Sequence, residues 1–225
     1  MSKSIFWRGI LNHYPQNNWA KALTIELKKL NLARSTKVVD APCGNGAITF
    51  WLANTIKNKF ELIDRSKLFT TMIFLWSRSN EQICLKNGDL FYELERTPSD
   101  DVWLLINSLY LFPNPLEMIT MYRPRFKYIL AIFPYLDKIN YHYFCKRPFR
   151  SSNTKNYTLK DTISIFSDAG YDLQTKIDLT AIPFFKYDLL GLGSILRYLL
   201  GQIDKEMSPV DGQYWLGVFV RKDNS

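Results

Sequence analysis

Short apolar runs alternate with amphipathic segments along most of the chain. The runs typical of β-strands cover residues 37–41, 60–64, 82–85, 101–107, 127–133, 171–179 and 213–221. Between them, apolar residues at helical spacing predict helices over 17–32, 48–56, 66–78, 114–123 and 158–167. The run at 101–107 is apolar almost throughout, which is typical of a parallel strand buried on both faces. Strands and helices alternating at this pitch indicate βαβ units and a parallel sheet.

Local signals place two helix boundaries. Asn114, Pro115 and Glu117 combine an N-cap, a proline at the first helical position and a capping-box carboxylate. Thr158 caps the last predicted helix, and Gly170 ends it. No internal repeat or low-complexity linker interrupts the chain. At 225 residues and 47% apolar content, we expect one α/β domain with a full core over residues 1–225.

One turn in this pattern carries candidate chemistry. Asp40 ends the first strand, and Gly44 and Gly46 follow before the next helix, so the backbone of this turn can press against a ligand. A dinucleotide fingerprint needs a third glycine three residues later, where this chain has Thr49. The P-loop signature is missing too, because no Gly-Lys-Ser/Thr closes the turn. An ordinary αβ turn remains the plain alternative.

The turn resembles the first motif of the class I S-adenosylmethionine-dependent methyltransferases, usually Asp-x-Gly-x-Gly-x-Gly, and departs from it once, at Pro42. The seven predicted strands, with a late return strand, resemble the core of this family over nearly the whole chain. The resemblance implies a Rossmann-like class I methyltransferase fold. That fold has a mainly parallel seven-stranded sheet, a late antiparallel strand and helices on both faces. It also implies S-adenosylmethionine as the cofactor and methyl transfer as the activity.

Further acidic residues follow the next two strands. Asp64 ends the second strand about twenty residues after the turn, where a carboxylate can accept both hydroxyls of a ribose. By resemblance, Asp89 matches the position that takes the adenine amino group. The alternatives are a surface pair of Asp64 with Arg65 or Lys67, and a simple turn at Asp89. The cofactor contacts that we expect are Asp40, Ala41, Gly44, Gly46, Asp64, Arg65, Asp89, Leu90, Asn107 and Tyr14.

Residues for the acceptor side are harder to assign. Asn107 and Tyr110 follow the fourth strand, beside the expected position of the transferred methyl, and faintly resemble an Asn-Pro-Pro-Tyr motif without its prolines. Segment 134–157 is dense in aromatic and basic residues and is expected to cap the substrate. His142 is the candidate general base in it, and a solvated loop is the alternative. The expected catalytic residues are His142 and Tyr110, and the expected substrate contacts are Tyr135, Tyr141, Arg147 and Arg150.

Two more segments frame the predicted pocket. Residues 1–35 form an N-terminal helical segment, and residues 183–208 resemble the insertion that completes the substrate pocket in small-molecule methyltransferases. Within the latter, residues 189–203 have a wide apolar face with Arg197, so peripheral membrane contact is an alternative to packing on the core.

Composition adds bounds on location and partners. The N-terminal apolar residues are interrupted too early for a signal peptide, and three widely spaced cysteines suit a reducing compartment, so we expect a cytoplasmic protein. Only two histidines and no Cys-x-x-Cys pair are present, so no metal site is predicted. The net charge of +8 favours an acidic partner: nucleic acid, an anionic membrane or an acidic small molecule.

These patterns rank three functions. The first is methyl transfer to an oxygen or nitrogen of a small molecule, such as an aromatic compound, a sugar or another secondary metabolite, with an acidic acceptor suiting the charge. An RNA methyltransferase ranks lower, because no RNA-binding domain or long Lys/Arg stripe is present, and no stable nucleic acid partner is expected. The third is a catalytically silent module that docks to a membrane or partner. A monomer or a homodimer is expected.

Overall fold

The computed structural model describes residues 14–44, 46–78, 80–96, 101–134, 157–179 and 214–223. They form a seven-stranded sheet in the order β3-β2-β1-β4-β5-β7-β6. The strands are β1 (Lys37–Asp40), β2 (Lys59–Asp64), β3 (Ile83–Asn87), β4 (Asp101–Ile106), β5 (Phe126–Pro134), β6 (Tyr171–Leu179) and β7 (Tyr214–Arg221). β1 to β5 pair in parallel, while β7 runs antiparallel to both of its neighbours, β5 and β6. The predicted parallel sheet with a late antiparallel strand is confirmed.

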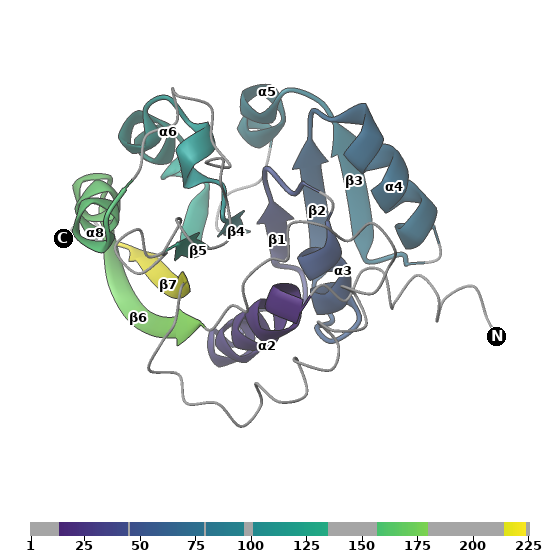
Figure 1. The fold of residues 1–225 in the computed structure, drawn as a ribbon, viewed down its shortest axis with the longest axis horizontal. Helices are drawn as coiled ribbons and strands as arrows, with labels where there is room; N and C mark the ends of the chain where they lie inside the picture. Colours follow the sequence, from purple (N-terminus) through teal and green to yellow (C-terminus); the bar gives the residue numbers. More distant parts are fainter. Residues whose placement is uncertain are drawn as a thin grey trace, which may run out of the picture.

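Helices cover both faces of this sheet (Figure 1). They are α2 (Tyr14–Lys29), α3 (Ala47–Ala53), α4 (Lys67–Ser77), α5 (Leu90–Glu95), the 3₁₀ turn η1 (Leu109–Leu111), α6 (Pro115–Tyr122) and α8 (Leu159–Asp168). Alternate residues of the strands feed two separate cores, since successive side chains of a strand point to opposite faces. Val38 and Leu104 pack with α2, α3 and α4, whereas Val39 and Leu105 pack with α5, α6 and α8. The predicted two-faced α/β architecture is therefore confirmed.

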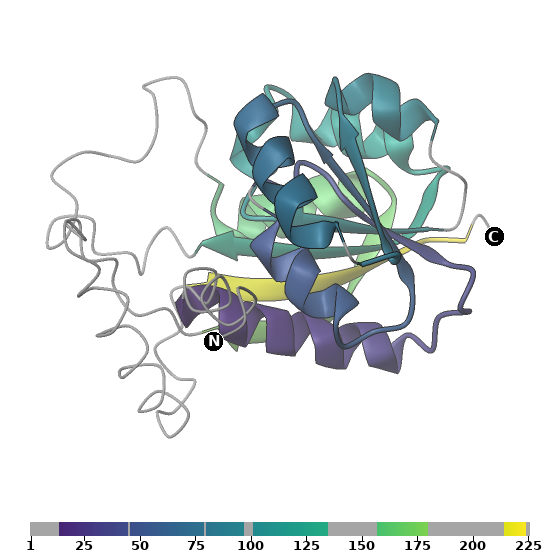
Figure 2. The same ribbon diagram turned by 90° about the vertical axis from the view of Figure 1, so that its right-hand side faces the viewer.

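Residues of α2 pack against the late strand from one face. Trp19 on α2 is 7% exposed, and its ring lies 4.8 Å from that of Tyr214 on β7. Figure 2 shows α2 running alongside β7 on the same face as α3. Leu23 and Leu27, one and two turns later, are fully or almost fully buried. The amphipathic pattern thus places the start of α2 close to the carboxyl edge of the sheet.

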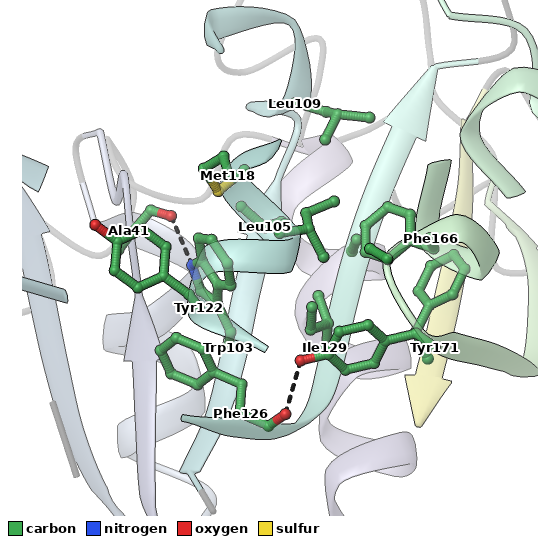
Figure 3. Close-up of a cluster of buried hydrophobic side chains, with 14 of the residues drawn as sticks. Ala41, Trp103, Leu105, Leu109, Met118, Tyr122, Phe126, Ile129, Phe166 and Tyr171 are labelled. Atoms are coloured by element: carbon green, nitrogen blue, oxygen red, sulfur yellow. Dashed lines mark hydrogen bonds between the residues drawn. The ribbon is translucent and has the colours of Figure 1, made fainter. Parts of the chain in front are cut away.

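The other face holds an aromatic core around β4 (Figure 3). Trp103 on β4 is fully buried, and its ring packs against those of Tyr122 and Phe126. The distances between ring centroids are 6.1 and 5.0 Å. Two hydrogen bonds from ring groups pin this core to the backbone. Trp103 Nε1 donates to the carbonyl of Ala41 at 2.8 Å, and the Tyr171 hydroxyl donates to that of Phe126 at 2.7 Å. The first bond fixes the backbone that leads into the glycine turn.

Both predicted helix starts are confirmed, and the contact between Asn114 and Glu117 runs through their side chains as well. Thr158 and Asp161 form a reciprocal capping box at the start of α8. Asn114 caps α6 by accepting from the Glu117 amide, and its side chain also donates to the Glu117 carboxylate. Sequence patterns missed α5 and η1, because a helix of six residues and a single 3₁₀ turn are too short to show a helical period.

The described part of the chain has no helix that combines the length and the apolar character needed to cross a membrane. Of the two predicted capping segments, 134–157 lies outside the described residues except at its two end residues, and 183–208 lies entirely outside them, as does the part of the N-terminal segment before residue 14.

Candidate functional site

A cleft of about 730 Å³ opens where the strands of one half of the sheet end. Its walls come from the segments that follow β1, β2, β3 and β4, together with the start of α2. All four strands are parallel, so their carboxyl ends meet at one edge, which is where open α/β sheets bind ligands. Asp40, Asp64, Asp89 and Asn107, predicted separately from the sequence, all line this one cleft.

Asp40 is the most buried charged group of the cleft, with 2% of its surface exposed. Its Oδ2 accepts a hydrogen bond from the hydroxyl of Thr49 on α3. Its Oδ1 is buried and has no hydrogen-bond partner among the described residues. Burial raises the pKa of Asp40 to about 7; the Thr49 hydrogen bond opposes this rise, and the charge of Asp64 adds to it. Half of this carboxylate is therefore left to be satisfied by something bound in the cleft.

The two glycines of the turn have different roles. Both have positive φ, +54° at Gly44 and +64° at Gly46. A Cβ at Gly46 would lie 2.9 Å from the side chains of Ile73 and Leu62, so this glycine is required by the core beneath it. A Cβ at Gly44 would meet nothing within 4 Å, and Gly44 lines the cleft. Gly44 therefore keeps a space clear that a ligand can fill.

Asp64 holds the turn in place. Its Oδ2 accepts from the amide of Gly44 at 2.9 Å, and its Oδ1 accepts from the amide of Ser66 at 2.8 Å. The ends of β1 and β2 are thus tied together through one carboxylate. Each of its oxygens has a second lone pair, so Asp64 can still accept the ribose hydroxyls expected from the sequence.

Asp89 also has a structural role that the sequence did not predict. Its Oδ1 accepts from the amides of Phe91 and Tyr92 at 3.0 and 3.3 Å, which makes Asp89 the N-cap of α5. Asp89, Leu90 and Phe91 line the cleft, with the Phe91 side chain 41% exposed. Phe69 of α4 is also in the lining and is 38% exposed, so the cleft offers exposed apolar surface as well as a carboxylate.

The segment after β4 forms the other wall. Asn107 has a φ of +48°, and its backbone amide donates a hydrogen bond to the carbonyl of Ile132 on β5 at 2.8 Å. Ser108 is 2% exposed, and its hydroxyl has no hydrogen-bond partner among the described residues. Tyr110 and Leu111 continue the lining toward solvent. Residues 107–111 thus combine a left-handed backbone conformation at Asn107, an unsatisfied hydroxyl at Ser108 and an exposed apolar side chain at Leu111.

Two predicted contacts, Ala41 and Gly46, have structural roles, and the side chain of Tyr14 lies outside the described part of the structure. Ala41 is fully buried beneath the cleft, with its carbonyl bonded to Trp103 and its amide to the carbonyl of Leu104. Gly46 is the N-cap of α3, and neither residue is among the described residues that line the cleft. Tyr14 is the first residue of α2. Thr49, Trp103, Trp19 and Ser108 were not predicted, because their roles depend on partners far away in the sequence.

Charge in the cleft runs opposite to the charge of the chain. Asp40, Asp64 and Asp89 are the acidic residues in the described lining, and Arg65 is the basic one. This excess of carboxylates disfavours a pyrophosphate and favours a cationic ligand. Cys43 also lines the cleft, and burial together with Asp40 and Asp64 raises the pKa of its thiol. The thiol stays protonated, which excludes it as a thiolate nucleophile.

The expected acceptor-side residues are mostly outside the described part of the chain. His142, Tyr135, Tyr141, Arg147 and Arg150 lie in the undescribed segment 135–156. Tyr110 is described and lines the cleft.

Solved structures with the same architecture support the fold. One is described as the complex between the Haloferax volcanii Trm112 methyltransferase activator and the putative methyltransferase; it has a TM-score of 0.66 and 14% sequence identity, over 97% of this chain and 96% of that one. Magnesium protoporphyrin IX methyltransferase (ChlM) from Synechocystis PCC 6803, solved with bound SAH, has a TM-score of 0.60 and 14% sequence identity. The match covers 92% of this chain and 83% of that one. The [4+2]-cyclase SpnF has a TM-score of 0.61 and 12% sequence identity, and the match covers 90% of this chain and 82% of that one.

No protein-family model and no curated protein sequence matches this chain. The similarity to solved structures is at low sequence identity and shows the fold. The chain has the Rossmann-like fold of the class I methyltransferases, as the sequence resemblance implied.

Proposed function

We propose that the protein binds S-adenosylmethionine in this cleft and transfers its methyl group to an oxygen or nitrogen of a small molecule. The observation that carries the proposal is a cleft at the carboxyl edge of a class I methyltransferase sheet, with more carboxylates than cations and one carboxylate oxygen left unpartnered. S-adenosylmethionine carries a sulfonium and an ammonium, so a cleft of this charge suits it. The ChlM neighbour, whose fold is similar, was solved with bound SAH.

The residues present fit such a ligand on both sides of the glycine turn. Gly44 leaves open space in the cleft, and Asp64 holds the turn that forms this space. We assign the ribose hydroxyls to Asp64, because it lies at the end of β2 and retains free lone pairs. We assign the adenine to the pocket beside Asp89 and Leu90, with Arg65 at its edge.

The bound cofactor would supply an activated methyl group. The protein's own residues then have to orient the acceptor and exclude water, so a dedicated base is optional. The acceptor would enter beside Asn107 and Tyr110, where Leu111, Phe112 and Pro113 give the cleft an apolar rim. His142 as general base, and Tyr135, Tyr141, Arg147 and Arg150 as substrate contacts, remain part of the proposal for the segment 135–156.

A small acceptor is favoured over RNA by the charge of the cleft. Arg65 is the cation in its described lining, whereas three carboxylates would repel a phosphate backbone. The ChlM neighbour methylates a small molecule, magnesium protoporphyrin IX, as its name states. We keep the cytoplasmic location and the monomeric or dimeric state as predictions from the sequence. The acidic character of the acceptor rests on the net charge of +8 alone, since the carboxylates of the cleft do not favour it.

Binding of the cofactor product tests the first half of this proposal. S-adenosylhomocysteine should raise the melting temperature of the wild type and give a saturable isotherm in titration calorimetry. ATP and NAD should not, because their phosphates face the carboxylates of the cleft. Absence of binding by S-adenosylhomocysteine would overturn the proposal.

Methyl transfer is a separate question, because SpnF shows that a similar fold is found in a [4+2]-cyclase. Purified protein with S-adenosylmethionine and panels of phenols, carboxylic acids and amines should release S-adenosylhomocysteine and give a product heavier by one CH₂. Retention on RNA that falls steeply with salt, together with methylation of that RNA, would instead favour the nucleic-acid function.

A further inference from the structure

Three of the residues that line the cleft have a buried polar atom without a hydrogen-bond partner among the described residues. These atoms are Trp19 Nε1, Asp40 Oδ1 and Ser108 Oγ. All three residues are at least nine-tenths buried, with exposures of 7%, 2% and 2%, and all three line the cleft. Each such atom costs about 1–3 kcal/mol when it remains unsatisfied. A common ligand is the economical explanation for three in one cleft.

These atoms come from separate parts of the chain. Trp19 lies on α2, Asp40 ends β1, and Ser108 follows β4. β1 and β4 are neighbours in the sheet, and Asp40 is in register with Leu104 of β4. Asp40 and Ser108 therefore lie in the β1–β4 half of the cleft, apart from Asp64 and Asp89 at the ends of β2 and β3, and Trp19 lines the same cleft from α2.

The kinds of atom define the ligand. An indole N–H can only donate, an ionised carboxylate can only accept, and a hydroxyl can do both. The group bound here must therefore present a cation to Asp40 and an acceptor to Trp19 beside it. A phosphate would be repelled by Asp40, and a simple amine would leave Trp19 unsatisfied. An α-amino acid end, with an ammonium and a carboxylate on one carbon, satisfies all three.

We propose that Trp19 and Ser108 hold the carboxylate, and Asp40 the ammonium, of the amino-acid end of the ligand. This inference rests on the proposed cofactor, and it adds two residues of this chain to its site. Trp19 also connects the site to the late strand, because its ring packs on Tyr214. A residue of α2 thus becomes part of the binding site through the packing of α2 on β7.

Titration calorimetry with two ligands tests the proposal. The first ligand is S-adenosylhomocysteine, and the second is its decarboxylated analogue, which keeps the ammonium and lacks the carboxylate. Trp19→Phe keeps a ring against Tyr214 and removes the donor. We expect this variant to lower the affinity for S-adenosylhomocysteine about 10-fold, which is the effect of losing one hydrogen bond to a charged group. The affinity for the analogue should stay within about 2-fold of the wild type.

The matched control is Trp51→Phe. Trp51 is 36% exposed on α3 and is not among the described residues of the cleft, so both affinities should stay unchanged. Ser108→Ala is the second variant, with an expected loss of about 3-fold or more for S-adenosylhomocysteine alone. It also keeps the proposal testable if Trp19→Phe does not fold.

The outcomes are distinct for each claim. If the wild type binds neither ligand, the proposed function fails. If it binds S-adenosylhomocysteine and the Trp19 and Ser108 variants bind both ligands like the wild type, the assignment of the carboxylate is wrong while the proposed function stands. Equal weakening of both ligands would also overturn the assignment, since it would show a general disturbance of the cleft.

Discussion

The two halves of the cleft differ in how their polar groups are satisfied. In the β2–β3 half, Asp64 accepts hydrogen bonds from two backbone amides, and Asp89 accepts hydrogen bonds from two others. In the β1–β4 half, Asp40 and Ser108 each keep a buried polar atom without a partner among the described residues, as does Trp19 on α2. The first half is therefore shaped by the protein alone. The second half pays a cost in the free protein that a ligand would recover, which is typical of a binding site.

This difference predicts opposite responses to mutation. Changes in the satisfied half should lower the stability of the fold, and changes in the unsatisfied half should mainly lower affinity. The following variants test this, in order of decreasing effect on stability.

The turn that joins the halves should give the largest effect. Gly46→Ala would place a Cβ 2.9 Å from Ile73 and Leu62 at a φ of +64°. Strain and overpacking together should cost about 3 kcal/mol, seen as a fall in melting temperature of roughly 6–12 °C. Gly44→Ala is the control, because its Cβ meets no atom within 4 Å. It should cost only about 1 kcal/mol and should instead weaken S-adenosylhomocysteine.

Asp64→Asn should come next. An asparagine has one acceptor oxygen, so the amide of Gly44 or Ser66 loses its partner, at about 1–3 kcal/mol in chemical denaturation. The matched control is Asp89→Asn, since only Oδ1 of Asp89 caps α5 and asparagine is an equally good N-cap. That control should stay within about 0.5 kcal/mol of the wild type. Equal losses in the two variants would show that the second carboxylate oxygen of Asp64 does not contribute to stability.

Asp40→Asn should have a smaller effect that depends on pH. The pKa of Asp40 is raised to about 7 in the folded protein, so ionising this buried carboxyl opposes folding. That penalty is fully present above pH 7 and is lost as the pH falls toward the ordinary pKa of an aspartate. At pH 8 the variant should therefore be more stable by about 1–2 kcal/mol, after the cost of its unpaired amide.

Melting curves from pH 8 to pH 5 check this sign. The advantage of Asp40→Asn should shrink steadily and vanish near pH 5. At every pH the variant should bind S-adenosylhomocysteine more weakly, since the acceptor for its ammonium is gone. A stability difference that is constant with pH would show that Asp40 is not the group that titrates.

Ser108→Ala should have the smallest effect on stability. Its hydroxyl is buried without a partner among the described residues, so its removal relieves an unsatisfied polar group and should raise the free energy of unfolding of the free protein by about 1 kcal/mol. Urea denaturation with and without S-adenosylhomocysteine separates the two effects. Only the stabilisation that the ligand adds should fall. A loss of more than about 1 kcal/mol without ligand would mean that the hydroxyl has a structural partner.

Several features of the fold followed from the sequence because they depend on neighbouring residues. The alternation of apolar runs predicted all seven strands and the parallel part of the sheet. Thr158 and Asn114 mark their helices by contacts three residues away, and both caps are present. Gly44 and Gly46 predicted a tight turn, and both have a positive φ, which glycine adopts without strain. Asp40, Asp64 and Asp89 were placed at one edge because parallel strands end together.

Other features required contacts between distant residues. Trp103 binds the carbonyl of Ala41 over 62 positions, and Thr49 binds Asp40 across the turn. Nothing in the local pattern distinguishes Trp103 or Trp19 from other core residues. The place of Asp89 in the cleft was predicted, but its role as the N-cap of α5 was missed because α5 is too short to give a period.

The sequence by itself determined the fold class and the acidic residues of the candidate site, because both follow from short-range periodicity and from the rule that parallel strands share an edge. The tertiary structure decided which of those residues are satisfied and which are not. It left Asp40 with an unpartnered oxygen, and it brought Trp19 and Ser108 to the same cleft. Hydrogen bonding and burial depend on the packing of segments far apart in the chain, and this information is carried by no single stretch of sequence.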